Sequence, residues 1–158
     1  HEKVPLLEEV VSELGGQFLI NIELTNYSSI NDALPELAGE LVKKYPFIDS
    51  ILFSSFQAQN LLRIRKVIPN CKVGYLTLPG LVGKISAWIY SKLPFDAIHP
   101  HYTHVTETFV QYHHSRGRKL YTWTVNDPLV MKKLLKMGVD GIITDNPGLA
   151  KQVRESIV

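Results

Sequence analysis

The sequence is short of cysteine and of excess charge. Cys71 is the only cysteine among 158 residues, so no disulfide can form within the chain. This fits a reducing compartment, and we expect a cytoplasmic protein. The 17 basic and 15 acidic residues leave a formal net charge of only +2. Because nucleic-acid-binding proteins usually present a strongly basic face, nucleic acid is not an expected partner.

Long apolar runs and several familiar motifs are also missing. No apolar run approaches the ~20 residues that span a bilayer, so no transmembrane segment is expected. Residues 1–10 lack the basic region and apolar core of a signal peptide. A first residue of His rather than Met indicates processing, a cut from a longer chain, or a tag remnant. Nothing matches a Walker loop, a GxGxxG loop or a Gly-x-Ser-x-Gly elbow.

Apolar segments rich in β-branched and aromatic residues recur along the chain. They predict strands at 18–24, 50–56, 72–78, 95–100, 119–125 and 141–145. Helical patterns lie between most of them, at 4–16, 31–45, 57–69, 106–117 and 127–138. We expect Asn31 or Asp32 to cap the second helix, and Asp127 to cap the last of these, with Pro128 in its first turn. The apolar segment 79–94 fits either a helix or a covering loop.

The alternation of strands and helices predicts a single α/β domain with a parallel sheet. The sheet would be doubly wound or part of a (β/α)8 barrel, because a complete barrel usually needs ~250 residues. In both architectures, functional sites form where the strands end at their carboxyl termini. The polar and aromatic residues at those ends are Glu23, Thr25, Ser54, Ser55, Phe56, Tyr75, Thr77, His99, His101, Trp123, Asn126 and Asp145.

Glu23 is the most unusual of these residues, because it follows the apolar run 18–22. An unpaired carboxylate inside a buried strand is very costly. Glu23 is therefore at the exposed end of its strand, paired with a cation, or held for chemistry. For most other residues at strand ends, ordinary solvation is as good an explanation as function.

The histidines of the segment 99–104 suggest a second, weaker possibility. His99 and His101 have the spacing that places two imidazoles on one face of a strand, and His104 follows. Pro100 interrupts that strand, and a zinc site also needs a third ligand held by further hydrogen bonds. A zinc hydrolase built on these three histidines is thus a minor alternative.

Several motifs together resemble the glycerophosphodiester phosphodiesterase family, in that family's order and spacing. They are "VPLLEEV" (4–10), "LINIEL" (19–24), "SILFSSF" (50–56), "KVGYL" (72–76), "YTWTVND" (121–127) and "GVDGIITDNP" (138–147). The resemblance implies part of a TIM-type barrel, with about six parallel strands alternating with helices. It also implies metal-assisted hydrolysis of a small phosphodiester to sn-glycerol 3-phosphate and an alcohol.

The sequence also departs from the family pattern. The family's His-Arg-Gly, Pro-Glu-Asn-Thr and Glu-x-Asp motifs, and the His-Asp motif that follows them, do not occur. In the family those segments supply the acid/base histidines and most of the metal-binding carboxylates. The chain resembles only the C-terminal portion of such an enzyme, and alone it should be inactive. Thr25 stands where the family usually has lysine, and threonine cannot supply that positive charge.

The resemblance implies a role for each candidate residue. Glu23 corresponds to a ligand of Mg²⁺ or Ca²⁺, although one carboxylate would hold such an ion only weakly. The metal would polarise the phosphoryl oxygens and orient the nucleophile, which in this family is the glycerol 2-hydroxyl. Trp123 would form an apolar wall of the site. The expected substrate-binding residues are Thr25, Ser55, Phe56, Tyr75, Trp123 and Asn126.

A non-enzymatic alternative is a truncated homologue that binds a ligand or associates with itself. An incomplete barrel has exposed sheet edges, which natural proteins usually cover. Such a chain would form a homodimer through those edges. A start codon near this N-terminus would favour that alternative, whereas catalytic motifs encoded upstream would favour the enzyme.

Overall fold

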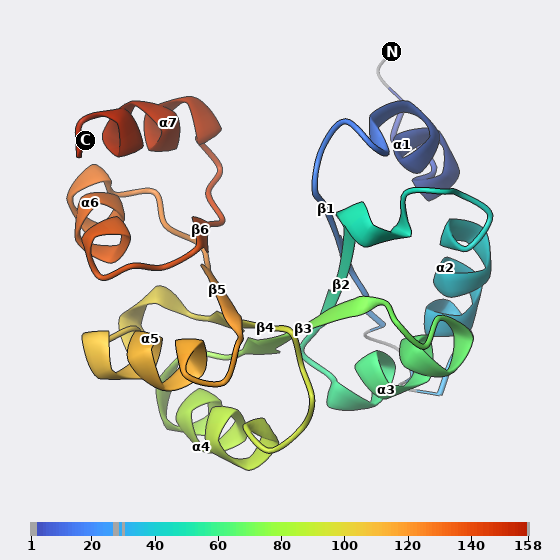
Figure 1. Cartoon of the computed structure of the whole chain (residues 1–158), viewed down its shortest axis with the longest axis horizontal. Helices are drawn as coiled ribbons and strands as arrows, with labels where there is room; N and C mark the ends of the chain where they lie inside the picture. The colour runs from blue at the N-terminus through green and yellow to red at the C-terminus, as the bar shows by residue number, and fades with distance from the viewer. Residues whose placement is uncertain (1–2, 27–28, 30, 158) are drawn as a thin grey trace. The chain divides into compact units, whose positions relative to one another are not determined.

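A computed structural model describes residues 3–26, 29 and 31–157. Within them, six strands alternate with helices along the chain (Figure 1). Residues 1–75 and 76–158 each form a compact unit. No helix in the described residues is long and apolar enough to cross a membrane.

The first unit contains two complete strands and the start of a third. Its elements are α1 (Leu7–Leu14), β1 (Ile20–Glu23), α2 (Leu34–Val42), the 3-10 turn η1 (Ile48–Ser50), β2 (Ile51–Ser55) and α3 (Ala58–Val67). The next strand, β3 (Lys72–Thr77), begins in this unit and ends in the second. Neighbouring strands pair in parallel, with Phe53 opposite both Ile22 and Val73. These three side chains are buried and form the centre of the unit.

Close packing of α2 on α3 depends on a glycine. A Cβ at Gly39 would lie 2.9 Å from both Ile64 and Val67 on α3. That distance is too short for carbon atoms, so with a larger residue at 39 the side chains of Ile64 and Val67 would have to shift. Glycine at this position thus allows α2 and α3 to pack closely.

The second unit repeats the same strand-and-helix order. Its elements are α4 (Gly80–Tyr90), β4 (Ala97–Pro100), the 3-10 turn η2 (Tyr102–His104), α5 (Glu107–His114), β5 (Lys119–Thr122), α6 (Pro128–Lys136), β6 (Gly141–Ile142) and α7 (Pro147–Glu155). The strands β4, β5 and β6 pair in parallel, with Ile98 opposite Leu120 and Thr122 opposite Ile142. Ile98, Leu120 and Met131 belong to one buried apolar cluster.

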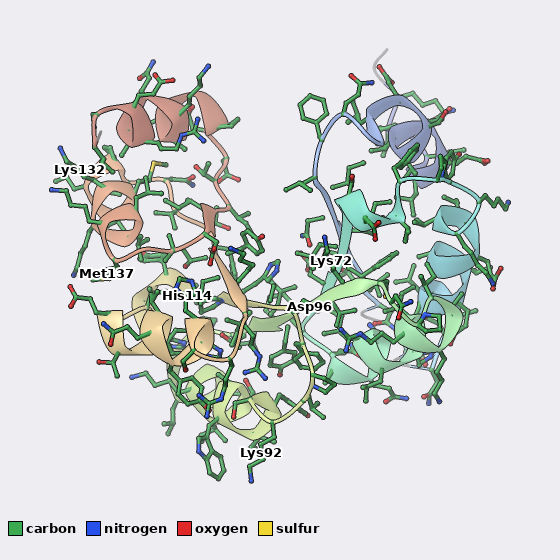
Figure 2. All side chains as sticks on the ribbon, in the orientation of Figure 1. Lys72, Lys92, Asp96, His114, Lys132 and Met137 are labelled. Atoms are coloured by element: carbon green, nitrogen blue, oxygen red, sulfur yellow. The ribbon has the colours of Figure 1, made fainter. Side chains whose placement is uncertain are left out.

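Ion pairs tie the amino end of β5 to the turn before β6. The Asp140 carboxylate lies 2.8 Å from both Lys119 Nζ and His114 Nε2, and it accepts a bond from the Leu120 amide. Figure 2 labels His114 on α5. Burial opposes the charged form of Asp140, but hydrogen bonds from Lys119, the Leu120 amide and His114 hold its pKa below its ordinary value.

Most predicted elements are confirmed, with shorter bounds. Six parallel strands alternating with helices are present, and the segment 79–94 contains a helix. The Asp127 carboxylate caps α6 by accepting bonds from the amides of Leu129 and Val130, as predicted. The predicted cap of α2 is displaced: the helix begins at Leu34, and Asp32 accepts a bond from its amide at 3.0 Å. The prediction of one domain stays a prediction.

Candidate functional site

Glu23 lies at the exposed carboxyl end of β1. The side chains of Ile22 and Leu24 on either side are buried, whereas Glu23 points to solvent. Its Oε1 accepts a bond from the Thr25 hydroxyl at 3.2 Å, and Thr25 is also exposed. Within the described residues, no cation forms an ion pair with this carboxylate. Glu23 is thus available for a ligand, and solvation explains why the strand tolerates it.

The described residues do not form a complete site for a hard divalent cation. Mg²⁺ and Ca²⁺ take six or more oxygen ligands, usually from more than one carboxylate. In the part of the chain that the structure describes, no three His, Cys, Asp or Glu residues lie close enough together to hold a metal. Glu23 can contribute one ligand, and any further carboxylates must come from other residues.

Ser55 belongs to a buried polar network behind the end of β1. Its hydroxyl donates to the Leu24 carbonyl at 2.7 Å and accepts from the Gln57 amide at 3.1 Å. The Asn60 side chain donates to Asn26 Oδ1 at 2.8 Å and lies 3.2 Å from Ser55 Oγ. All three polar side chains of the network, Ser55, Asn60 and Asn26, are buried. The network fixes residues 24–26, directly after β1, against the end of β2.

Asn26 and Asn60 were not among the residues predicted from the sequence. Asn60 lies within α3, where Leu61 and Ile64 share its buried side. The only sign of this network in the sequence is a polar residue within the apolar pattern of the helix. Because a buried amide must be hydrogen-bonded, asparagine at such a position indicates buried polar partners.

The aromatic candidates of the first unit lie near Ser55. Tyr75 on β3 is paired in register with Ser55 and is 4% exposed. Phe56 follows β2 directly and is half-buried. The structure thus brings Ser55 and Tyr75 together as buried residues, and it leaves Glu23 and Thr25 exposed at the strand end.

Trp123 is anchored to the neighbouring strand in the second unit. Its Nε1 donates to the His99 carbonyl at 2.9 Å, and its ring meets the His101 ring edge-on at 5.2 Å. The backbones of His101 and Trp123 also form a parallel bridge. These contacts fix the indole at the carboxyl ends of β4 and β5, with part of its surface exposed.

Asn126 organises the loop that follows β6. Its Oδ1 accepts bonds from the Thr144 hydroxyl at 2.9 Å and the Asp145 amide at 3.0 Å. Its Nδ2 donates to Asp145 Oδ2 at 2.7 Å. Asn146 caps α7 by accepting a bond from the Leu149 amide. Asn126 is exposed, so its amide can face a ligand while it holds this loop.

The histidines of the segment 99–104 do not gather as a zinc site. His99 is buried, its ring packs edge-on against Tyr121, and neither ring nitrogen has a partner among the described residues. His101 Nδ1 bonds the Thr103 hydroxyl at 2.8 Å, and the rings of His101 and His104 are 6.3 Å apart. Since no three metal-ligating residues cluster in the described chain, the zinc alternative fails.

Comparison with known proteins identifies related sequences. The model of the "Glycerophosphoryl diester phosphodiesterase family" matches residues 1–149. A glycerophosphodiester phosphodiesterase from Caldanaerobacter subterraneus is 33% identical over 148 residues, covering 92% of this chain and 60% of that protein. A protein of the same name from Bacillus altitudinis is 32% identical, covering 98% and 64%. The chain spans less than two thirds of the length of either relative.

Solved structures share the fold. A phosphodiesterase from Oleispira antarctica, in complex with the product sn-glycerol-3-phosphate, superposes with a TM-score of 0.76 at 21% identity, covering 96% of this chain and 61% of that one. A glycerophosphodiester phosphodiesterase from Thermotoga maritima gives 0.67 at 24% identity, covering 97% and 64%. At such identities the likeness shows the fold alone. It confirms the predicted fold class, part of a TIM-type barrel.

Acid should destabilise the second unit through its buried histidines. Burial lowers the pKa of His99 to about 4, from an ordinary 6.5. Below pH 6.5 the imidazole of His99 takes up a proton in the unfolded chain but not in the folded chain. The free energy of unfolding therefore falls as the pH approaches 4, by roughly 3 kcal/mol. Burial and the nearby Arg118 lower the His113 pKa in the same direction. His99→Leu should therefore flatten, but not abolish, the dependence of urea unfolding on pH. An unchanged slope would contradict this account of His99.

The network around Asn60 should contribute measurably to stability. Asn60→Ala removes the donor to Asn26 and leaves buried polar atoms without their bonds. The expected loss in the free energy of unfolding is about 1–3 kcal/mol. The matched control is Gln59→Ala, on the exposed side of the same helix, with an expected change within about 0.5 kcal/mol. Equal effects of the two substitutions, measured by urea denaturation, would show that the network stabilises nothing.

Proposed function

Because this chain belongs to the glycerophosphoryl diester phosphodiesterase family, we propose that it supplies part of the active site of an enzyme that hydrolyses glycerophosphodiesters. The products would be sn-glycerol 3-phosphate and an alcohol. The observation that carries the proposal is the exposed carboxylate of Glu23 at the end of β1, inside the segment that matches the family. Named relatives with this activity, at 32–33% identity, support it further.

Glu23 would serve as one ligand of a divalent cation, Mg²⁺ or Ca²⁺. Such an ion supplies a Lewis acid for the phosphoryl oxygens when it is bound. Among the described residues, only Glu23 is proposed to bind this ion, and no group of three possible ligands occurs. The other carboxylate ligands would therefore come from other residues. The Thr25 hydroxyl lies beside Glu23 and carries no charge. The positive charge that faces the phosphate must then come from elsewhere as well.

The other candidate residues would contact the small-molecule substrate. Trp123 offers a partly exposed indole for the glycerol or the leaving alcohol, and Asn126 offers an exposed amide. Phe56 would contribute an apolar surface in the first unit. Ser55 and Tyr75, which are buried, would act by fixing the strand ends rather than by lying on the surface. The buried thiol of Cys71 is consistent with the proposed cytoplasmic location.

The 158 residues alone should be inactive, because they lack the motifs that supply the family's acid/base histidines. We expect no release of glycerol 3-phosphate from glycerophosphocholine or glycerophosphoethanolamine, with Mg²⁺, with Ca²⁺ or with chelator. Where the gene encodes those motifs upstream, the product of the whole reading frame should be active and sensitive to chelator. In that longer protein, Glu23→Gln should reduce activity by at least ~10–100-fold, which is the loss typical of removing even an outer partner of a metal ligand.

Two results would contradict the proposal. Chelator-sensitive turnover by a folded sample of the 158 residues would mean that another set of groups performs the chemistry. An inactive product of a reading frame that includes the upstream motifs would remove the phosphodiesterase assignment. The matched control for Glu23→Gln is Glu13→Gln, on the exposed surface of the same unit, which should leave activity unchanged.

A second candidate function is self-association, favoured by the edge of the sheet at β1. Among the described strands, β1 pairs only with β2, and its other edge has no strand beside it. Phe18 and Leu19 precede it and are 60% and 83% exposed. An exposed apolar edge is a template for pairing with another chain.

Sedimentation should then reveal a concentration-dependent dimer. Leu19→Lys should shift that equilibrium toward the monomer, because a charge at the edge opposes pairing. Leu37→Lys, at a comparably exposed apolar position on α2, is the matched control and should leave the dimer unchanged. A strictly monomeric wild-type chain at high concentration would end this second candidate.

A further inference from the structure

The helix α4 exposes its large side chains and buries its small ones. Leu81, Val82, Ile85, Trp88 and Ile89 are between 48% and 72% exposed. Gly83 and Ala87 are the buried residues of the same helix. A surface helix of a folded protein normally has the reverse arrangement, with its large apolar residues facing the core. Something other than this chain's own core must therefore favour large apolar residues on the outer side.

The five exposed residues form one continuous stripe, the α4 face. At 3.6 residues per turn, the positions 81, 82, 85, 88 and 89 fall within an arc of about 120°. The inner side of the helix is close-packed at Gly83, where a Cβ would lie only 1.5 Å from the Leu78 carbonyl oxygen and 3.0 Å from the His104 ring. A large residue does not fit at that position, and the large apolar residues of α4 lie on the outer side.

The charged residues of α4 and of the chain that directly flanks it are all basic. Between residues 76 and 95 the only charged side chains are Lys84 and Lys92, and both are exposed. Lys84 borders the stripe within the helix, and Lys92 lies just beyond its end (Figure 2). No acidic residue occurs in this stretch. The combination of an apolar stripe, a tryptophan and flanking lysines complements an apolar surface with a negative rim.

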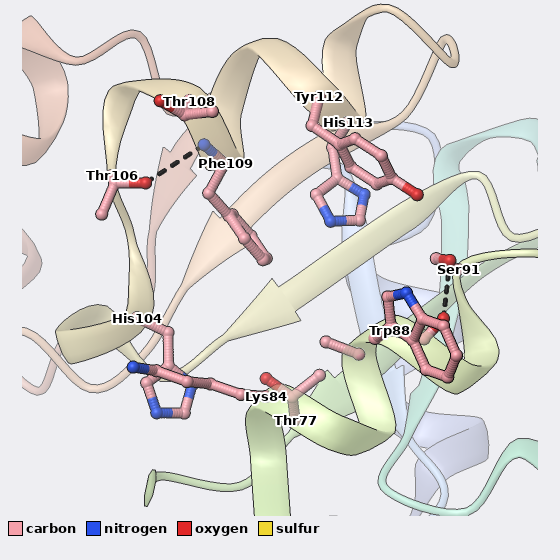
Figure 3. Close-up of a pocket in the computed structure, with 11 residues that line it drawn as sticks. Thr77, Lys84, Trp88, Ser91, His104, Thr106, Thr108, Phe109, Tyr112 and His113 are labelled. Atoms are coloured by element: carbon pink, nitrogen blue, oxygen red, sulfur yellow. Dashed lines mark hydrogen bonds between the residues drawn. The ribbon is translucent and has the colours of Figure 1, made fainter. Parts of the chain in front are cut away.

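A hollow of about 430 Å³ adjoins the same helix in the second unit. Figure 3 shows Lys84 and Trp88 of α4 on one side of it and Phe109, Tyr112 and His113 of α5 on the other. Its lining is mostly apolar. A site that takes alkyl chains has this character, with a few polar groups at its margin. Trp88 belongs both to the α4 face and to the lining of this hollow, so the hollow adjoins the face at that residue.

We propose that the α4 face is a contact site for the surface of an anionic phospholipid bilayer. The large apolar side chains would insert at the boundary between headgroups and acyl chains, and Trp88 would lie at the depth that tryptophan prefers. Lys84 and Lys92 would lie against the negative headgroups. This inference rests on α4 and its surroundings, and it holds whether or not the proposed phosphodiesterase function is correct.

A bilayer is favoured over a second copy of this chain because both charged residues of the stretch 76–95 are lysines. A second copy of this face would oppose lysine with lysine, since the stretch 76–95 contains no carboxylate. Like charges held close together disfavour such a pair. An anionic bilayer satisfies both the apolar stripe and the two lysines.

Binding to vesicles tests the proposal directly. Phosphatidylcholine vesicles that contain phosphatidylglycerol should bind the 158-residue chain in co-sedimentation, and binding should weaken as salt rises. The triple substitution Leu81→Ser/Ile85→Ser/Ile89→Ser should reduce the partition coefficient by at least about tenfold. Lys84→Gln and Lys92→Gln should each cost about fivefold on these vesicles and nothing on pure phosphatidylcholine.

Tryptophan emission supplies a second readout. Trp88 is 72% exposed, so its emission should shift to shorter wavelength on vesicles. The shift should be lost in Trp88→Phe and kept in Trp123→Phe. Leu129→Ser, at a 77% exposed position on α6, is the matched control for lost apolar surface and should bind as the wild type does.

The proposal is overturned if the wild-type chain does not bind the anionic vesicles. It is also overturned if the triple variant, shown to be folded by its thermal transition, binds them as tightly as the wild type. If the wild-type chain does not bind vesicles and instead dimerises through the α4 face, this surface is a contact site for a second copy of the chain.

Discussion

Parallel pairing of the strands is the constraint on which the rest of this structure depends. A parallel neighbour cannot be reached by a tight turn, so each strand needs a crossover, and a helix supplies it. The same constraint sends every carboxyl end within a unit to one edge of its sheet. Glu23 at the end of β1 lies opposite Ser54 of β2 for this reason, and Trp123 after β5 lies beside His101 after β4. The candidate residues are far apart in sequence, and within each unit the backbone pairing of the strands brings their ends together, where side-chain bonds such as that of Trp123 to His99 fix them.

At the strand ends, buried polar groups hold the backbone in place and exposed polar groups are free to contact a ligand. The buried side chains form their hydrogen bonds with one another and with the backbone, as in Ser55, Asn60 and Asn26. A buried polar group needs such a partner, because it has no access to water. The bonds of these three side chains hold residues 24–26 in place. Glu23, directly before this segment, and Thr25, within it, remain exposed, so they can meet a ligand without first losing a buried bond. A fixed backbone beneath exposed groups is the arrangement that a binding site requires.

Sequence patterns predicted the fold well where periodicity or a specific cap carried the signal. The strand near Phe53 and the helix begun by Asp127 and Pro128 are examples, since apolar alternation and capping chemistry are local. The segment 79–94 could not be assigned, because it is apolar and contains Gly80 and Gly83, which are unfavourable within a helix. That α4 turns its small residues inward is visible only in the folded chain. The role of Asn60 escaped prediction because its partners, Asn26 and Ser55, are brought to it only by tertiary structure.

The exposed apolar face of α4 begins close to the edge of the sheet where the strands end. Only Leu78 and Pro79 separate the end of β3 from the start of α4, so the first turn of the helix lies at the carboxyl edge of the sheet. Leu81 and Val82, in that first turn, are exposed there. A bilayer in contact with the α4 face would consequently lie near the edge at which Trp123 and Asn126 are placed in the same unit. A helix that displays leucine, isoleucine and tryptophan to water is costly for a protein whose surface meets water alone. The same display is favourable where the helix lies against a bilayer, because its apolar side chains then leave the water.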